Sequence, residues 1–197
     1  MKTNPLPVQG AWRLGWTLDA HMTASVFLGH DQNGHAQYDN TRSALGELLF
    51  QLKYRNQLQA ASQIAEIMVA FLSDKSVLVS RIDLVVPMPA STSRPVQPVN
   101  AIASKLAASL HKPYSENALR KTKETPKVKN MNDPEQRREM LDGAFEGDEA
   151  QLQGKGVLLV DDLYDSGSTA NAVTLALIAA GSDRVCFLAA TRTRSNI

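Results

Sequence analysis

The sequence predicts an α/β domain in which a mostly parallel sheet of about five strands is flanked by helices. Two stretches of the chain predict this class. Residues 157–160 form an apolar run that is followed by a polar loop, a helical pattern and a second apolar run at 184–190. Strand, loop, helix and strand at this spacing are typical of a right-handed parallel crossover. A β-branched run at 82–86, also followed by a helical pattern, repeats the arrangement.

The first 43 residues predict a β-rich or irregular leader that forms a hood over the core. Apolar and aromatic residues between 12 and 40 are interrupted by Asn33-Gly34, a dipeptide suited to the positive φ angles of a tight hairpin turn. Trp12, Trp16 and Tyr38 fit two interpretations, because aromatic side chains either line an acceptor pocket under the hood or pack the leader onto the core. The predicted division is therefore a leader at 1–43 and a core domain at 44–197.

Two helices, or one kinked helix, are predicted between residues 44 and 72. Apolar residues recur there at helical spacing on either side of a polar stretch at 53–57. These apolar residues are Leu45, Leu48, Leu49 and Leu52, then Ile64, Ile67, Met68, Phe71 and Leu72. A strand at 82–86 ends at Pro87-Met88-Pro89, and apolar residues that recur every four positions predict a helix over about 98–110.

Basic residues are concentrated between 119 and 138, which predicts a flexible flap. The segment contains seven lysines and arginines against three acids and has little apolar content. It would end in a short helix that Asn132 or Asp133 caps, with Pro134 in the first turn. Three interpretations fit the flap: a solvated loop, a lid that closes over a leaving group, or a nucleic-acid contact. The lack of aromatic residues for stacking on bases disfavours the third. Beyond the flap, Gly181 is expected to stop a helix over 170–180.

Composition indicates an ordinary globular protein. The chain has 197 residues, a formal net charge of +1, 43% apolar residues and 21% charged residues. Nucleic-acid binding driven by a charged tail is therefore not expected. The start of the chain lacks the apolar run of a signal peptide, and no segment approaches the roughly 18 apolar residues of a membrane span. We expect a cytoplasmic protein.

The only cysteine, Cys186, lies in an apolar run that is typical of a buried thiol, and a single cysteine excludes disulfides within the chain.

The loop that follows residue 160 combines carboxylates with groups that bind anions. Glycine and the N–H groups at the start of a helix form a cradle for a phosphate, and Ser166, Ser168 and Thr169 add hydroxyl donors. Asp161 and Asp162 would repel a phosphate, but carboxylates accept hydrogen bonds from sugar hydroxyls and hold Mg²⁺ through water. A ribose 5-phosphate satisfies both halves of the loop. Ligands of open parallel sheets collect at this end of the strands.

These residues closely resemble the phosphoribosyl pyrophosphate (PRPP) motif of type I phosphoribosyltransferases, in which two acids follow an apolar strand and precede a turn rich in Ser, Thr and Gly. The chain further resembles the ComF-type, competence-associated branch over about residues 45–191. The segments that carry this second resemblance are Leu52-Lys53-Tyr54, Val86-Pro87-Met88-Pro89, Arg94, Asn100 and Gly143-Ala144-Phe145. The paired N-terminal cysteines of ComF-type proteins, which suggest a zinc ribbon, have no counterpart here, and the Arg-Gly-Phe-Asn-Gln stretch of that branch is only loosely matched at 94–100.

The resemblance implies a pentosyltransferase of nucleotide metabolism that uses PRPP and Mg²⁺. It would transfer the phosphoribosyl group to a nucleophile that the sequence does not identify, and it would release pyrophosphate. The fold implied is that of the type I phosphoribosyltransferases, which often form homodimers. The resemblance also leaves room for a different class of function. This alternative is a non-catalytic regulator that binds PRPP or a nucleotide, with a link to DNA uptake or competence.

The roles of individual residues follow from the same resemblance. Asp161 and Asp162 would bind the ribose hydroxyls and, through water or ligand, the metal. Asp165, Ser166, Gly167, Ser168 and Thr169 would bind the 5-phosphate. Ala90, Ser91, Arg94, Lys123 and Lys127 would bind the pyrophosphate, with Arg94 as its main charge partner during catalysis.

Asp165 carries a second implied role. It stands where purine-using relatives have an acid that exchanges a proton with the incoming base, so it is the candidate general acid or base. An alternative needs no catalysis, because aspartate commonly caps the N-terminus of a helix, here at Ser166 or Gly167. Tyr164, one residue earlier, would contact the base or ribose, or pack against the core.

Overall fold

A five-stranded sheet organises the computed structural model, which describes residues 1–90, 96–123 and 133–193. The strand order is β1-β2-β9-β8-β5, in which only β1 runs antiparallel to its neighbour. These strands are β1 (Leu6–Pro7), β2 (Leu14–Ala20), β5 (Leu84–Pro87), β8 (Gly156–Tyr164) and β9 (Arg184–Arg192). The predicted class, a mostly parallel sheet of about five strands flanked by helices, is confirmed.

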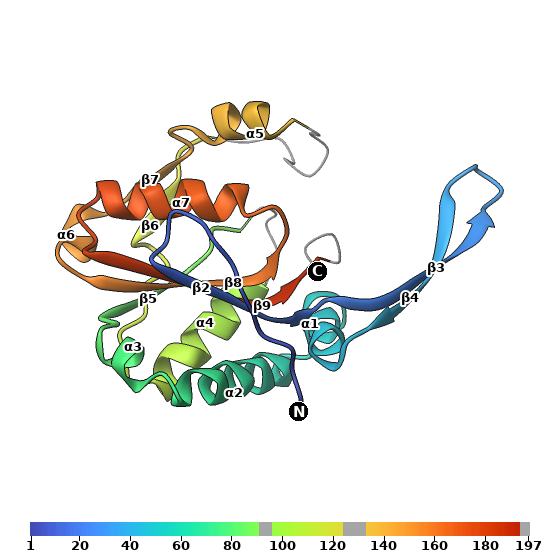
Figure 1. The fold of residues 1–197 in the computed structure, drawn as a ribbon, viewed down its shortest axis with the longest axis horizontal. Coiled ribbons are helices and arrows are strands. Elements are labelled where there is room, and N and C mark those ends of the chain that lie inside the picture. The colour runs from blue at the N-terminus through green and yellow to red at the C-terminus, as the bar shows by residue number, and fades with distance from the viewer. Residues whose placement is uncertain (91–95, 124–132, 194–197) are drawn as a thin grey trace.

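Helices cover both faces of the sheet (Figure 1). One face packs against α1 (Ala44–Tyr54), α2 (Gln59–Ser73) and α4 (Pro98–Ser109), and the other packs against α7 (Ser168–Ala179). The short helices are α3 (Ser76–Ser80), α5 (Pro134–Leu141) and α6 (Glu149–Leu152). The periodicity predictions for 44–72, 98–110 and 170–180 are confirmed. The polar stretch at 53–57 separates two helices rather than kinking one.

Two separate apolar cores result, one on each side of the sheet. The larger contains Leu49 of α1, Met68 of α2 and Leu106 of α4, all fully buried. The other forms around Phe187 of β9 and includes Val173 of α7. Successive residues of a strand point to opposite faces, so strands that are buried on both sides are apolar throughout. Cys186 is buried in the larger core, as its sequence context predicts.

The leader divides into two parts. Strands β1 and β2 belong to the central sheet, where β2 pairs in parallel with β9. Strands β3 (Met22–His30) and β4 (Ala36–Arg42) form a separate hairpin that projects from the body (Figure 1). The sequence predicts the hairpin from Asn33-Gly34, but it contains no signal that β2 would join the sheet, because the partner strand lies about 170 residues away.

Two differences from the predicted elements concern the site. Strand β8, expected to end at residue 160, continues to Tyr164 because the backbone of the acidic residues still pairs with β9. The basic segment begins with β6 (Leu119–Lys121), which pairs with β7 (Phe145–Gly147), and Asp133 caps α5 through its side chain. The predicted cap at 132 or 133 is therefore confirmed as Asp133. Among the described residues, no helix combines the length and apolar character that a membrane span requires.

Replacing Ser43 with alanine should lower the free energy of unfolding by about 1 kcal/mol. The buried Ser43 hydroxyl accepts a hydrogen bond from the Gly46 N–H at 2.9 Å and caps α1, the helix that follows the hairpin. Urea denaturation measures the change. Ser80→Ala is the control, because that exposed hydroxyl only donates to the Val77 carbonyl within α3. Equal losses in the two variants would contradict the capping role.

Candidate functional site

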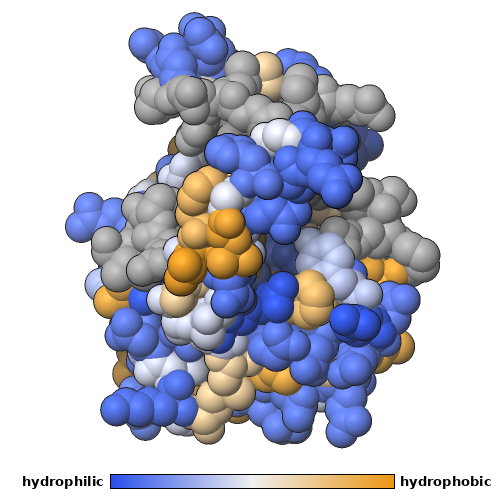
Figure 2. All heavy atoms as spheres, turned by 90° about the vertical axis from the view of Figure 1, so that its right-hand side faces the viewer, coloured by the Kyte–Doolittle hydropathy of each residue, from blue (hydrophilic) through white to orange (hydrophobic). Residues whose placement is uncertain are grey.

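The carboxyl ends of β2, β5, β8 and β9 lie at one edge of the sheet, because these four strands are parallel. Asp161 and Asp162 are near the end of β8, Thr193 follows β9, and Ala90 follows β5. Figure 2 faces this side of the molecule and shows mainly hydrophilic residues around a smaller apolar patch. The residues that the sequence singled out in the PRPP-like motif therefore converge at the edge where parallel sheets bind their ligands.

The loop between β8 and α7 has the form of an anion cradle. Gly167 is the N-cap of α7 and adopts the left-handed conformation at φ 78°, with no side-chain capping hydrogen bond. Its carbonyl accepts the first helical hydrogen bond, from Asn171 N–H at 2.8 Å. The Ser166 and Ser168 hydroxyls lie 3.0 Å apart beside these amides. The first N–H groups of a helix have no acceptor within the helix, and the helix dipole favours an anion there.

Replacing Gly167 with alanine should weaken phosphate-ester binding about tenfold, because the left-handed conformation costs an L-residue roughly 1–2 kcal/mol. The added Cβ would also lie 2.7 Å from the Tyr164 hydroxyl oxygen, so either the Tyr164 ring or the loop has to shift. Gly154→Ala is a matched control. Gly154 has φ 70°, nothing within 4 Å of an added Cβ, and a position before the opposite end of β8. Calorimetric titration with ribose 5-phosphate measures the affinity of each variant, and only Gly167→Ala should bind more weakly. A similar loss of affinity in both variants would contradict a specific role for Gly167.

The two acids of the motif have different surroundings. Burial, together with the neighbouring Asp162 carboxylate, raises the pKa of Asp161 to about 7. The Asp162 N–H opposes this shift by donating to Asp161 Oδ1 at 2.7 Å. Asp162 forms an ion pair with Lys53, whose Nζ lies 2.8 Å from Asp162 Oδ1. Asp161 therefore retains its proton to a higher pH than an ordinary aspartate does, and both side chains can hydrogen bond to hydroxyls.

Asp165 is held by the residue that follows β9. The Thr193 hydroxyl donates to Asp165 Oδ1 at 2.9 Å, and the Thr193 N–H donates to the Tyr164 carbonyl at 2.9 Å. The N-cap of α7 is Gly167, which has no side chain, and the Ser166 hydroxyl accepts a hydrogen bond from the Ser168 N–H at 3.4 Å. The alternative in which Asp165 caps α7 therefore stays a prediction. Thr193 holds the Asp165 carboxylate in place directly before the serines of the loop.

Aromatic side chains pack together beside the loop between β8 and α7. Trp12 stacks on Phe187 with ring centroids 4.7 Å apart and meets Tyr164 edge to face at 6.4 Å. Trp16 meets Phe71 of α2 edge to face. Of the alternatives left open by the sequence, packing therefore holds for both tryptophans and for Tyr164. Burial raises the pKa of Tyr164. Tyr38, in contrast, is half exposed on the projecting hairpin, where it contacts Phe27.

The predicted pyrophosphate residues are only partly within the described chain. Ala90 is exposed just beyond β5. Lys123 is exposed, and its Nζ donates to the Asp142 carbonyl at 3.2 Å. Ser91, Arg94 and Lys127 lie outside the described residues. Sequence reasoning assigned no role to Lys53 or Thr193, although the structure places both against the acids of the motif.

The surroundings of Asp161 and Asp162 bear on whether they could hold Mg²⁺. In the part of the chain that the structure describes, no group of three or more His, Cys, Asp or Glu side chains forms a metal cage. A carboxylate that is paired with Lys53, beside an acid whose pKa is raised to about 7, would hold Mg²⁺ only through the metal's waters, and a phosphorylated ligand would supply most of its other oxygens.

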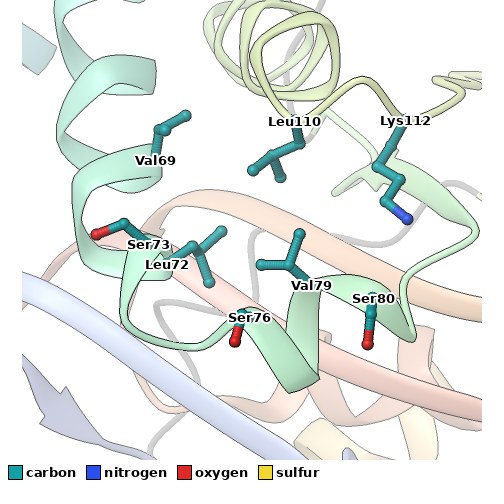
Figure 3. Close-up of a pocket in the computed structure, with 8 residues that line it drawn as sticks. All are labelled: Val69, Leu72, Ser73, Ser76, Val79, Ser80, Leu110 and Lys112. Carbon is teal, nitrogen blue, oxygen red and sulfur yellow. The ribbon is translucent and has the colours of Figure 1, made fainter.

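A separate hollow of about 350 Å³ lies between α2, α3 and the end of α4 (Figure 3). Val69, Leu72, Val79 and Leu110 give it an apolar lining, to which Lys112 and three serines add polar groups. Helix α4 runs back from the carboxyl end of β5, so this hollow is remote from the acidic pair. It is not part of the candidate site.

The chain matches no family model and no curated protein. Solved structures with a similar fold were found, and two of them are described here. One is the structure of the allosteric regulatory enzyme of purine biosynthesis, with 20% identity and a TM-score of 0.39; the match covers 57% of this chain and 23% of that chain. Another is glutamine phosphoribosylpyrophosphate amidotransferase from B. subtilis complexed with ADP and GMP, with 16% identity and a TM-score of 0.46; the match covers 81% of this chain and 34% of that one. The likeness thus spans about a third or less of either neighbour.

Proposed function

We propose that the protein is a phosphoribosyltransferase that binds PRPP at the carboxyl edge of its sheet. One observation carries the proposal: a carboxylate pair and an anion cradle stand together on the segment from Asp161 to Thr169, at the edge where parallel sheets bind ligands. The cradle fits a terminal phosphate, and the acids fit the vicinal hydroxyls of a ribose. The resemblance of the same residues to the PRPP motif supports this ligand over other sugar phosphates.

In the proposed complex, the amides that follow Gly167 and the hydroxyls of Ser166, Ser168 and Thr169 hold the 5-phosphate. Asp161 and Asp162 accept hydrogen bonds from the ribose hydroxyls. This arrangement fixes the sugar at both ends, so that carbon 1 is presented to the space beyond β5. Fixing the reacting carbon removes much of the entropic cost of the reaction.

Transfer breaks the bond between carbon 1 and the pyrophosphate oxygen and forms a bond between carbon 1 and the acceptor. Negative charge grows on the leaving pyrophosphate, and fixed cations that stabilise this charge accelerate the step. We assign this part to Ala90, Ser91, Arg94, Lys123 and Lys127, with the 119–138 segment as a lid. Mg²⁺ bound to the diphosphate would neutralise part of its charge, with Asp161 and Asp162 holding the metal through water.

We assign the acceptor's proton to Asp165. Its carboxylate is held by Thr193 directly before the serines of the cradle, close to the sugar in the proposed complex.

The acceptor is expected to enter from the side of the β3–β4 hairpin, which starts and ends near this edge of the sheet. Within the leader, β1 and β2 are part of the central sheet, so only the β3–β4 hairpin can form a hood over the acceptor.

The test is to incubate the protein with PRPP, Mg²⁺ and a panel of nucleobases, ammonia donors and amines, and to measure pyrophosphate release. The proposal predicts release that depends on one class of acceptor, and micromolar binding of PRPP without any acceptor. PRPP binding without release across the whole panel would contradict transfer and leave a binding protein. Absence of PRPP binding would contradict the site itself.

A further inference from the structure

Lys53 and Asp162 form a largely buried ion pair that joins α1 to the acidic pair of the site. The Lys53 Nζ lies 2.8 Å from Asp162 Oδ1, and the two side chains are only 17% and 16% exposed. From this contact we infer that Lys53 is a positioning residue, which orients the Asp162 carboxylate for the hydroxyls of a bound sugar. The inference rests on the proposed function, because it concerns the same ribose subsite.

The position of Lys53 on its helix is set by the core. Leu45 and Leu49 of α1 are fully buried, and Lys53 continues their stripe at a spacing of four residues. A stripe of this kind faces the sheet, so its last member reaches the end of β8 instead of solvent. A lysine at a core-facing position requires a partner, because burying an unpaired charge is costly. Asp162 provides that partner.

The contact restricts Asp162 at two points. Its Oδ1 is occupied by Lys53, and its backbone carbonyl accepts a hydrogen bond from the Thr191 hydroxyl at 3.0 Å. With the backbone and one carboxylate oxygen fixed, the orientation of Oδ2 is fixed as well. The ammonium also offsets repulsion between two adjacent acids, which would otherwise turn the carboxylates apart. Lys53 therefore acts through Asp162 and needs no contact with the sugar.

Discrimination between sugars follows from this geometry. A site built to hydrogen bond a hydroxyl rejects an analogue that lacks it, but only while its own polar group is held in place. Ribose 5-phosphate and 2-deoxyribose 5-phosphate share the phosphate and differ in one hydroxyl. The intact protein is expected to prefer ribose 5-phosphate about tenfold or more. Lys53→Met should reduce this preference to about twofold, since methionine keeps the length of the side chain but not the charge.

Calorimetric titration of the full chain with each sugar phosphate measures the preference. Lys105→Met is the matched control, because Lys105 is an exposed lysine on α4 and its replacement removes the same charge. The control should keep the tenfold preference. If Lys53 had a purely structural role, Lys53→Met would weaken the binding of both sugar phosphates equally and leave the ratio of the two affinities unchanged. That result would overturn the inference.

Thermal unfolding of the free protein gives an independent measurement. Lys53→Met should lower the melting temperature, because it leaves Asp162 largely buried without its partner, and the double variant Lys53→Met/Asp162→Asn should recover most of the loss. Additive losses in the double variant would overturn the inference. If the unaltered protein binds neither sugar phosphate, the proposed function fails and the inference about sugar preference fails with it. If the unaltered protein binds ribose 5-phosphate and Lys53→Met keeps the same preference for ribose 5-phosphate over 2-deoxyribose 5-phosphate, the inference about Lys53 fails and the proposed function stands.

Discussion

Asp165→Asn is expected to slow transfer about 100-fold while changing the Kd for PRPP less than threefold, since a positioned general acid or base contributes roughly 10²–10⁴ to a rate. Asparagine preserves the shape of the side chain and can still accept the hydrogen bond that Thr193 donates to Asp165. It cannot take up a proton from the acceptor. The loss should therefore be found in kcat, measured as pyrophosphate release with the acceptor that reacts fastest in the panel.

The control for Asp165 is Asp74→Asn, which makes the same replacement at an exposed position after α2. Its transfer rate should equal that of the unaltered protein. A rate for Asp165→Asn within twofold of the control, combined with a lower melting temperature, would show that Asp165 has only a structural task. Weakened PRPP binding at an unchanged kcat would instead assign Asp165 to the phosphate cradle.

Asp161→Asn is expected to weaken ribose 5-phosphate binding roughly 10- to 100-fold and at the same time to stabilise the protein. The binding loss reflects a charge-assisted hydrogen bond to a hydroxyl, worth roughly 1.5–3 kcal/mol. The gain in stability has a different origin. Burial and the neighbouring Asp162 raise the pKa of Asp161 to about 7, so its charged form is unfavourable in the fold. Asparagine removes that charge.

The gain should depend on pH. In the unfolded chain an aspartate has a pKa of about 3.9, so between that value and 7 the folded protein retains a proton that the unfolded chain has lost. Stability contributed by protonated Asp161 is therefore fully present below pH 4 and is lost as the pH rises through 7. The advantage of Asp161→Asn should be larger at pH 8 than at pH 5, by about 1–2 kcal/mol after allowance for partial solvent screening.

Urea denaturation at pH 5 and at pH 8 tests this difference, and Asp74→Asn again serves as the exposed control. A stability gain that is equal at both pH values would contradict the assigned charge state. A variant that becomes less stable and still binds ribose 5-phosphate normally would show that Asp161 supports the fold and not the ligand. Opposite changes in stability and binding are typical of residues that are selected for function.

The sequence predicts the parts of the fold whose signals are local. The apolar run at 157–160, the helical periodicity on either side of residues 53–57, and the stop at Gly181 each correspond to an observed element. Strand β2 could not be assigned to the central sheet, because its pairing with β9 depends on contacts between distant parts of the chain. The short pair β6 and β7 has only three residues in each strand, too few for a periodic pattern.

The candidate site is predictable to a similar extent. Asp161, Asp162 and the turn at 165–169 are contiguous, so their chemistry can be inferred from the sequence alone. Lys53 was not assigned a role because it lies about 110 residues earlier and interrupts the apolar stripe of α1 as an apparent surface residue. A charged residue in register with Leu45 and Leu49 is nevertheless a signal of a buried ion pair. Thr193 gives no comparable signal, since a hydroxyl after a strand is common.

The most direct test of the account is a crystal structure of the protein with PRPP and Mg²⁺. The account predicts that the 5-phosphate accepts hydrogen bonds from the amides that follow Gly167, that the ribose hydroxyls lie within hydrogen-bond distance of Asp161 and Asp162, and that Lys53 remains paired with Asp162. A phosphate bound elsewhere on the chain, or a ribose turned away from the two acids, would contradict it.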